Sequence, residues 1–389
     1  MTRSPKRAVI IGAGIAGLAA AHRLREAGWE PIVVERAPAR RPGGYAVTFS
    51  GIGYDAAERM GLLPALRLRH ITPDELVYVA PNGKRRFSVP GPTVRAMLGE
   101  RALNVLRGDI EDVLYEAIRD KVDLRFGTTI DTISQSEREV HLALSDGTEE
   151  TADLVIGADG LHSATRALAF GPEEDFRLDL GHMVGVFMLD ELPDVVTERA
   201  TSALTDTGRT LAVISLGQQR AAAFFGFRTD DVTRDLTDGP TLALTRTYGD
   251  MGWAAPHVLA QLPTAEDVYF DSVSQMLVNR WSRGRVVLLG DAAWCVTLFA
   301  GFGSSLAVGG ADLLGAALEL HPDDVPAALS AWESELRPQA ERKQKLGRRV
   351  KGLYAPADPF RLWLRDLPLR MAALPPVSRL LERHLQLKG

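Results

Sequence analysis

The first hydrophobic pattern in the chain is a short β-branched run, followed by closely spaced glycines and then by an apolar helical segment. Residues 7–11 predict a strand, residues 18–27 predict a helix, and residues 31–35 predict a second strand. The glycines between Gly12 and Gly17 form the turn between the first strand and the helix. The order strand, turn, helix, strand predicts a compact βαβ unit.

Further strands and helices are predicted up to about residue 156. A Pro-Asn-Gly turn at residues 81–83 predicts a hairpin between residues 76–79 and 85–89. A helix is predicted over residues 55–63, where Pro64 is expected to stop it. A second helix and four further strands are predicted at residues 109–118, 123–126, 129–133, 140–144 and 154–156.

The pattern changes between about residues 177 and 270. Segments of alternating hydrophobicity are separated there by loops rich in Thr, Asp and Gly, which is typical of antiparallel sheet. The pattern of a parallel strand resumes at residues 285–289, and the chain is nearly all helical from Ser304 onward. We therefore predict an α/β fold with an inserted, mostly antiparallel β-sheet and C-terminal helices.

Charge and cysteine content narrow the class of protein. The 45 Lys and Arg residues against 50 Asp and Glu give a net charge of −5, which provides no basic field for nucleic acid. Residues 342–351 are rich in Lys and Arg, but we interpret them as the solvated face of an amphipathic helix. The single cysteine excludes an internal disulfide. No window approaches 18 uninterrupted apolar residues, so we expect no membrane span and a cytoplasmic location.

The turn after the first strand carries a dinucleotide-binding pattern. Gly12, Gly14 and Gly17 follow a strand and open a helix, and Glu35 ends the next strand. In such a turn the glycines allow a sharp bend, close approach of a pyrophosphate and tight helix packing, and the acid accepts hydrogen bonds from ribose hydroxyls. The alternative is a glycine-rich packing turn. A similar pattern at residues 51–56 lacks a good preceding strand, so we interpret it as a helix N-terminus.

Two further apolar strands also end in glycine and aspartate. Residues 154–156 are followed by Gly157, Asp159 and Gly160, and residues 285–289 are followed by Gly290 and Asp291. Ligands of open α/β sheets lie beyond the carboxyl ends of strands. A helix cap is the alternative role for either aspartate. A second glycine-rich helix start follows at residues 301–305, where backbone N–H groups can meet an anionic or carbonyl group.

These three segments, in this order and spacing, resemble FAD-dependent aromatic hydroxylases of the p-hydroxybenzoate hydroxylase type, near the tetracycline-modifying and other actinobacterial natural-product hydroxylases. The resemblance spans about residues 7–345. It implies a Rossmann-like FAD-binding domain, which we place at residues 1–72, 96–172 and 270–330. It also implies a substrate domain at residues 73–95 and 173–269, followed by a C-terminal helical segment at residues 331–389.

FAD is the cofactor that the resemblance implies. Glu35 and Arg36 would lie at the adenosine ribose, and Arg107 near the ribityl and phosphate region. Asp291 would bind the ribityl chain or pyrophosphate, and Asp159 would serve FAD and a transient NADPH or NADH. The complete set of expected cofactor-binding residues is Gly12, Gly14, Ile15, Ala16, Gly17, Glu35, Arg36, Arg107, Ile130, Asp159, Asp291, Gly301, Gly303, Ser304 and Ser305.

In such enzymes NAD(P)H reduces the flavin, O₂ forms a C4a-hydroperoxide, and one oxygen atom passes to an electron-rich substrate. The flavin carries the reaction, so we expect no catalytic side chain and no metal. Phe187, Phe224, Phe225 and Phe227 are candidates for an apolar wall that suits a bulky aromatic or polyketide-like substrate. We name Phe187 and Phe225 as substrate contacts, although alternating strands bury one face in the core in any case.

One position departs from the family. Leu298 stands where related sequences carry a proline beside the reactive edge of the flavin. Because of this departure, an alternative hypothesis is a flavoprotein of the same fold that catalyses a different step, as an oxidase, reductase or cyclase. A nicotinamide dehydrogenase or a noncatalytic binding protein is a further alternative, and either a monomer or a homodimer fits the sequence.

Overall fold

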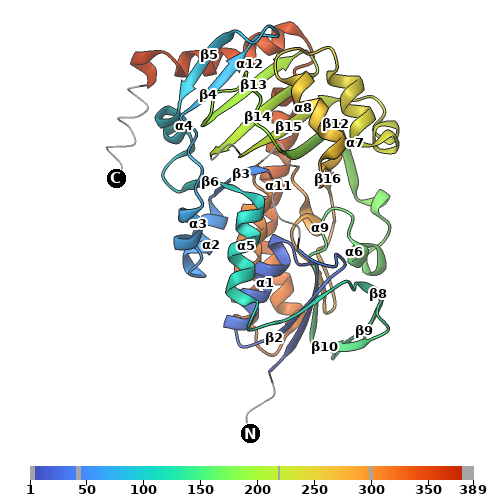
Figure 1. Ribbon diagram of the computed structural model, residues 1–389. Helices are drawn as coiled ribbons and strands as arrows, with labels where there is room; N and C mark the ends of the chain where they lie inside the picture. The colour runs from blue at the N-terminus through green and yellow to red at the C-terminus, as the bar shows by residue number, and fades with distance from the viewer. Residues whose placement is uncertain (1–4, 41–44, 218–219, 298–300, 379–389) are drawn as a thin grey trace.

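The computed structural model of the protein describes residues 5–40, 45–217, 220–297 and 301–378. A parallel sheet with its helices lies at one end of the molecule, and a large, mostly antiparallel sheet lies at the other (Figure 1). The long helix α11 (Val325–Tyr354) runs from the first region to the second. The α/β fold with an inserted antiparallel sheet is therefore confirmed.

The predicted βαβ unit forms the centre of the parallel sheet. β1 pairs in parallel with both β2 and β11, and α1 (Ile15–Glu26) connects β1 to β2. The strand order is β17-β18-β11-β1-β2-β7, and only the short β17 runs antiparallel to its neighbour. The bounds of these strands are Arg7–Ile11 (β1), Glu30–Glu35 (β2), Asp123–Phe126 (β7), Leu154–Gly157 (β11), Ser282–Arg283 (β17) and Val286–Leu288 (β18).

Both faces of this sheet are covered, which explains why its strands are apolar at successive positions. Ala8 and Ile10 face a core shared with α1, α5 (Arg107–Ile118) and α10 (Gly303–Leu320). Val9 and Ile11 face the other way, toward a three-stranded antiparallel sheet. That sheet consists of β8 (Ile130–Gln135), β9 (Val140–Leu144) and β10 (Glu149–Ala152). A strand buried on both faces reads as a continuous hydrophobic run.

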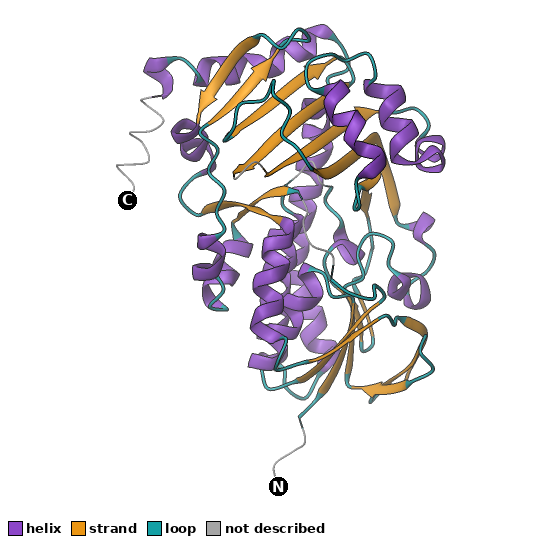
Figure 2. Ribbon diagram, in the orientation of Figure 1, coloured by secondary structure: helices purple, strands orange, loops and turns teal. Residues whose placement is uncertain are grey.

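The large sheet has seven strands in the order β16-β12-β15-β14-β13-β4-β5. All neighbouring pairs are antiparallel except β13 and β4. Helices α7 (Val232–Tyr248) and α8 (Ala255–Gln261) cover one face (Figure 2). The bounds of the strands are Glu75–Val79 (β4), Arg85–Pro90 (β5), Arg177–Leu189 (β12), Ala200–Asp206 (β13), Arg209–Gly217 (β14), Arg220–Arg228 (β15) and Tyr269–Met276 (β16).

Helices α7 and α8 were not predicted from the sequence. Gly239 (φ +74°) and Pro240 interrupt α7 with a kink, so its apolar positions do not follow one helical period. The prediction that Pro64 stops a helix was also wrong. The first helix there, α2 (Ile52–Arg59), ends earlier, and Pro64 lies in the first turn of α3 (Leu63–Leu68), where a missing N–H costs nothing.

Shorter elements complete the fold. β3 and β6 form an antiparallel pair between the two main sheets. Their bounds and those of the remaining short elements are Ala46–Ser50 (β3), Ala102–Leu106 (β6), Gly91–Leu98 (α4), Ala164–Ala169 (α6), Asp291–Trp294 (α9), Pro359–Ala372 (α12), and the 3₁₀ turns Glu173–Asp175 (η1) and Leu262–Thr264 (η2).

Three buried tryptophans pack where α9, α10 and α11 meet. Trp294 lies with its ring centroid 4.6 Å from that of Trp281 and 5.9 Å from that of Trp332. The indole N–H of Trp332 donates to the carbonyl of Gly310 at 2.9 Å. This cluster fixes the position of α9, and therefore of the chain that follows β18.

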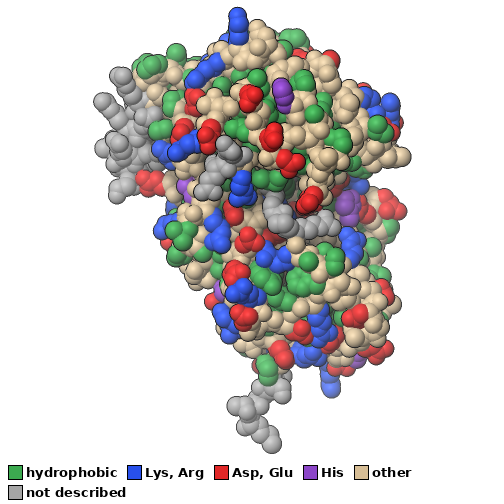
Figure 3. Space-filling model, viewed as in Figure 1, with side chains coloured by type: hydrophobic (Ala, Val, Ile, Leu, Met, Phe, Trp, Pro, Cys, Tyr) green, Lys and Arg blue, Asp and Glu red, His purple; other side chains and the backbone are tan. Residues whose placement is uncertain are grey.

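The surface carries both signs of charge. Acidic and basic side chains are intermixed on the face shown in Figure 3. In the basic run of α11, Arg342, Lys345 and Arg349 are exposed, whereas Gln344 and Gly347 are buried, as expected for an amphipathic helix. Within the described ranges, helices are too short or too polar to cross a membrane.

Close packing of α2 on α10 gives the first testable prediction. A Cβ atom at Gly53 would lie 2.4 Å from the Cα of Ser305, so we expect Gly53→Ala to lower the free energy of unfolding by about 1–3 kcal/mol. The matched control is Gly352→Ala in α11, where a Cβ meets no atom within 4 Å; it should raise that free energy by about 0.5–1 kcal/mol. Urea denaturation measures both. Equal effects would contradict the packing argument.

Candidate functional site

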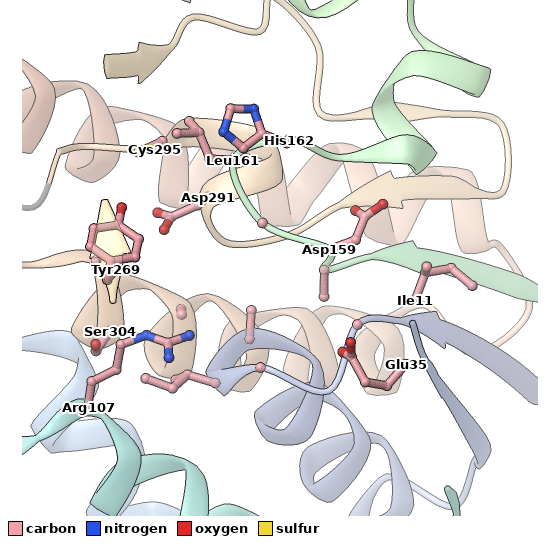
Figure 4. Close-up of a pocket in the computed structure, with 18 of the residues that line it drawn as sticks. Ile11, Glu35, Arg107, Asp159, Leu161, His162, Tyr269, Asp291, Cys295 and Ser304 are labelled. Carbon is pink, nitrogen blue, oxygen red and sulfur yellow. The ribbon is translucent and has the colours of Figure 1, made fainter. Parts of the chain in front are cut away.

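A cavity of about 320 Å³ lies where the parallel strands end. Its lining includes Gly12 after β1, Glu35 at the end of β2, Asp159 after β11 and Asp291 after β18. Glu35 and Asp159 lie at one end of the cavity, and Asp291 lies toward the other (Figure 4). The three glycine-rich segments thus converge on one site, as the sequence analysis expected, because the carboxyl ends of parallel strands share one edge of the sheet.

The three glycines of the first turn have different structural roles. Gly12 has a φ of +105°, and a Cβ there would lie 2.5 Å from the carbonyl oxygen of Ala158. A Cβ at Gly17 would lie 1.9 Å from the carbonyl oxygen of Gly12, so α1 packs on this turn only through glycine. A Cβ at Gly14 would make only ordinary contacts, at 3.7 and 3.8 Å. The space beside Gly14 therefore belongs to the cavity.

Backbone N–H groups hold the Glu35 carboxylate in place. One of its oxygens accepts from the N–H of Ala13 and the other from the N–H of Ala37, each at 2.8 Å. A carboxylate has about four acceptor positions, so lone pairs remain for hydroxyl donors. Arg36 also lines the cavity.

At the other end of the cavity, Arg107 forms an ion pair with Glu111 at 2.8 Å. Burial opposes the charged form of Arg107, but Glu111, Tyr45 and Asp291 raise its pKa overall. Asp291 opens into the cavity beside Gly303. Its enclosure by protein raises the pKa of the carboxyl group, against the influence of Arg107. A guanidinium and a carboxyl group thus face the same space from α5 and α9.

Asp159 supports the start of helix α6. Its carboxylate accepts from the N–H and hydroxyl of Thr165 at 2.9 and 3.0 Å, and from the hydroxyl of Ser163 at 2.5 Å. The N-cap residue itself is Ser163, whose hydroxyl accepts from the N–H of Arg166 at 2.9 Å, so Asp159 contributes to the cap without being the N-cap residue. Because Ala158, Asp159 and Gly160 also line the cavity, the capped turn forms part of its wall.

The start of α10 forms another wall. Gly301, Gly303 and Ser304 line the cavity, and in the described part of the chain no side chain caps this helix at Phe302. Ser305 is buried one layer behind, where its hydroxyl accepts from the N–H of Ser50 at 3.0 Å. Leu298 lies outside the described residues.

Two tyrosines at the aromatic end of the cavity were missed by the sequence analysis. The rings of Tyr45 and Tyr269 have centroids 5.8 Å apart, and both residues line the cavity. Desolvation raises the pKa of Tyr45 to about 12, and it also raises the pKa of Tyr269, which is 41% exposed where it lines the cavity. Both are therefore neutral phenols at physiological pH. Tyr45 lies just before β3 and Tyr269 begins β16. At the end of a strand, the alternation of apolar and polar residues does not indicate which side chains face a cavity.

The structure does not support Phe187 and Phe225 as substrate contacts. Both side chains are almost fully buried, and their rings stack against each other in the core between the sheet and α7. Phe224, the residue beside Phe225, points to the opposite face, which looks toward the cavity half of the molecule and carries Val184 and Val186. The sequence pattern identified the alternation but not which face is covered by helices.

Ile130 also lies in a core rather than at the cavity. It packs with β9 beneath the parallel sheet, while its neighbour Thr129 lines the cavity. Ile15 and Ala16 at the start of α1 do line it. Gly17 acts through packing, as described above.

His162 connects the cavity wall to the large sheet. Its Nδ1 lies 3.0 Å from a carboxylate oxygen of Glu173, and its Nε2 lies 3.1 Å from a carboxylate oxygen of Asp271 on β16. The hydrogen bond with Asp271 raises the pKa of His162, with Glu173 adding to the effect. The sequence analysis gave this histidine no particular role.

A cavity at the carboxyl ends of parallel strands, with a glycine turn that opens a helix, is typical of a dinucleotide-binding protein. The family described as "FAD binding domain" matches residues 6–344, and the chain belongs to this family.

Named relatives agree with this assignment. The chain is 31% identical over 343 residues to a flavin-dependent monooxygenase from an unknown prokaryotic organism, covering 87% of each chain. It is 30% identical over 372 residues to the FAD-dependent monooxygenase asL6 of Sarocladium schorii, covering 89% of this chain and 88% of the relative. The crystal structure of tetracycline destructase Tet(51) superposes with a TM-score of 0.82 at 28% identity, covering 95% of this chain and 96% of that one. The family is thus that of FAD-dependent monooxygenases.

The contacts of His162 predict a pH-dependent contribution to stability. Because its pKa is raised in the folded state, its ion pairs stabilise fully below the ordinary histidine pKa, and this stabilisation is lost as pH rises through the raised value. We expect His162→Gln to lower the melting temperature more at pH 6 than at pH 9. Asp271→Asn should shrink this difference between pH values. A loss that is the same at both pH values would contradict the assignment.

Proposed function

We propose that the protein is a monooxygenase that hydroxylates a bulky aromatic or polyketide-like molecule, using FAD, O₂ and NADPH or NADH. The observation that carries the proposal is a cavity at the ends of the parallel strands whose lining also includes two aromatic side chains, Tyr45 and Tyr269. Membership of the FAD-binding family supports the cofactor. The named functions of the relatives support the type of reaction.

The residues around the cavity suit FAD. The N-cap of α1 is Gly14, which has no side chain to occupy the first N–H groups of the helix. Those groups and the positive end of the helix favour a pyrophosphate. We propose that Glu35 accepts from the ribose hydroxyls and that Arg107 and Asp291 hold the phosphate and ribityl part. The N–H groups at the start of α10 would then face the flavin pyrimidine.

The chemistry supplied by bound FAD is acceptance of a hydride from the nicotinamide and activation of O₂ for transfer of one oxygen atom. The chain itself binds, orients and excludes water. Tyr45 and Tyr269 are neutral phenols that can donate hydrogen bonds at the aromatic end. On the sheet face above, Phe224 packs with its ring centroid 6.0 Å from that of Tyr354, behind the residues that line the cavity. A wall of aromatic rings with a few polar groups suits a polycyclic substrate.

Gly14→Val tests the cofactor site without disturbing the fold. A Cβ there would make only ordinary contacts within the protein, and valine is a poorer helix N-cap than glycine, so we expect the free energy of unfolding of the apoprotein to fall by about 0.5–1 kcal/mol. The same side chain fills the space proposed for the pyrophosphate, so the purified variant should lose its flavin absorption. Gly14→Ala should give a smaller loss of affinity. Normal FAD content in the valine variant would refute this placement.

Isotope incorporation tests the reaction. The purified protein, supplied with NADPH or NADH and a panel of polycyclic phenols under ¹⁸O₂, is expected to show substrate-stimulated nicotinamide oxidation. Mass spectrometry should find one ¹⁸O atom in the product. Nicotinamide oxidation that yields only hydrogen peroxide with every compound would instead favour the oxidase or reductase alternative. A colourless protein without affinity for FAD would refute both.

A further inference from the structure

Two buried glutamines form hydrogen bonds with the backbone of one wall of the cavity. Gln275 lies on β16 and is 0% exposed, and Gln344 lies on α11 and is 5% exposed. A side-chain amide costs free energy when it is buried unless its groups find partners. Both amides direct N–H groups at main-chain carbonyls of a segment that comprises the last residue of α9 and the residues directly after it.

The contacts cover three consecutive residues of this segment. The amide nitrogen of Gln344 lies 3.2 Å from the carbonyl oxygen of Trp294 and 3.4 Å from that of Cys295. One N–H of Gln344 donates to the carbonyl of Met276 at 2.8 Å, so the other N–H is shared between the carbonyls of Trp294 and Cys295. The amide nitrogen of Gln275 lies 3.2 Å from the carbonyl oxygen of Val296. Successive carbonyls are therefore held from the side of β16 and α11.

The two glutamines are themselves tied together. Gln275 donates to the main-chain carbonyl of Gln344 at 2.9 Å, and the guanidinium of Arg348 donates to the side-chain oxygen of Gln275 at 2.5 Å. Helix α11 approaches the segment closely, since a Cβ at Gly347 would lie 2.7 Å from the carbonyl oxygen of Val296. We call Gln275, Gln344 and Arg348 the amide clamp.

The gripped segment has a conformation that needs such support. Thr297 has a φ of +87°, a left-handed conformation that costs a residue with a side chain about 1–3 kcal/mol and persists only when the surroundings enforce it. Cys295 and Thr297 line the cavity, and Asp291 lies one helical turn before Cys295. A segment whose carbonyls are held from behind presents its other side to the cavity.

We propose that the amide clamp consists of positioning residues, which hold the 294–297 segment in the geometry that the cofactor cavity requires. This inference rests on the proposed FAD site. The described residues that line the cavity include Cys295 and Thr297 but neither Gln275 nor Gln344. The two glutamines therefore act through Cys295 and Thr297. The clamp also ties together elements far apart in sequence, namely β16, α9 and α11.

Cys295 provides a readout that is independent of activity. It is the only cysteine in the chain, it is 7% exposed, and burial raises the pKa of its thiol well above the ordinary value. A thiol reagent such as 5,5′-dithiobis(2-nitrobenzoate) should therefore react slowly with the native apoprotein. The rate of this reaction reports whether the 294–297 segment has moved. Because the chain has one cysteine, one equivalent of thiol reacts per protein molecule.

The experiment compares Gln344→Leu with the unchanged protein. We expect the thiol of the apoprotein to react roughly tenfold faster, as the loss of hydrogen bonds to Trp294 and Cys295 implies. The dissociation constant for FAD should rise by a similar factor. Gln261→Leu is the matched control, because Gln261 also bonds main-chain groups, at Asp190 and Glu191, but stands at the end of α8, outside the cavity lining. It should leave both values unchanged.

The outcomes separate positioning from general stability. A Gln344→Leu protein that melts at a lower temperature but reacts at the original thiol rate overturns the clamp. A faster thiol with an unchanged FAD dissociation constant overturns its connection to the cofactor. If Gln344→Leu does not fold, Arg348→Met, which leaves both amides in place, should raise the thiol rate by a smaller factor. Failure of the unchanged protein to bind FAD would refute the proposed function, while the thiol rates would still decide on the clamp.

Discussion

The site depends on the contact between helix α1 and the turn that precedes it. The backbone of Gly17 lies so close to the carbonyl oxygen of Gly12 that no side chain fits between them. This contact directs the first N–H groups of α1 at the space beyond β1, and it leaves Gly14 facing that space. The other walls of the cavity, from the ends of β2, β11 and β18, are placed relative to this turn by parallel pairing with β1 or with its neighbour β11.

The remaining walls come from the chain outside the parallel sheet. Tyr269 begins a strand of the large sheet, Arg107 begins α5, and Gly303 begins α10. Each of these elements is long or well packed, but each contributes only its end to the cavity. The cavity is therefore built from element termini, where backbone groups lack partners within their own element, and such groups suit a ligand with many oxygen atoms.

Much of this arrangement could be predicted from sequence. The glycine turn, Glu35 and the two Gly-Asp segments are local patterns with a direct mechanical meaning, and they lie around one cavity. The choice of Phe187 and Phe225 failed because strand alternation defines two faces without saying which one helices will cover. The amide clamp was beyond sequence reasoning for another reason. Gln275 and Gln344 acquire partners only when β16 and α11 meet, and isolated glutamines carry no periodic signal.

The pairing of β12 with β16 has a consequence for how the protein can vary. The large sheet is entered at Arg177, which pairs with Met276 where the chain leaves it. The segment that contains β4 and β5 likewise begins at Glu75 and ends at Pro90, and these two residues pair with each other. Both insertions thus begin and end at adjacent backbone, so the remaining chain would need little loop entropy to close without them. A change in the length of either insertion would therefore leave the points at which the chain joins the parallel-sheet half in the same place.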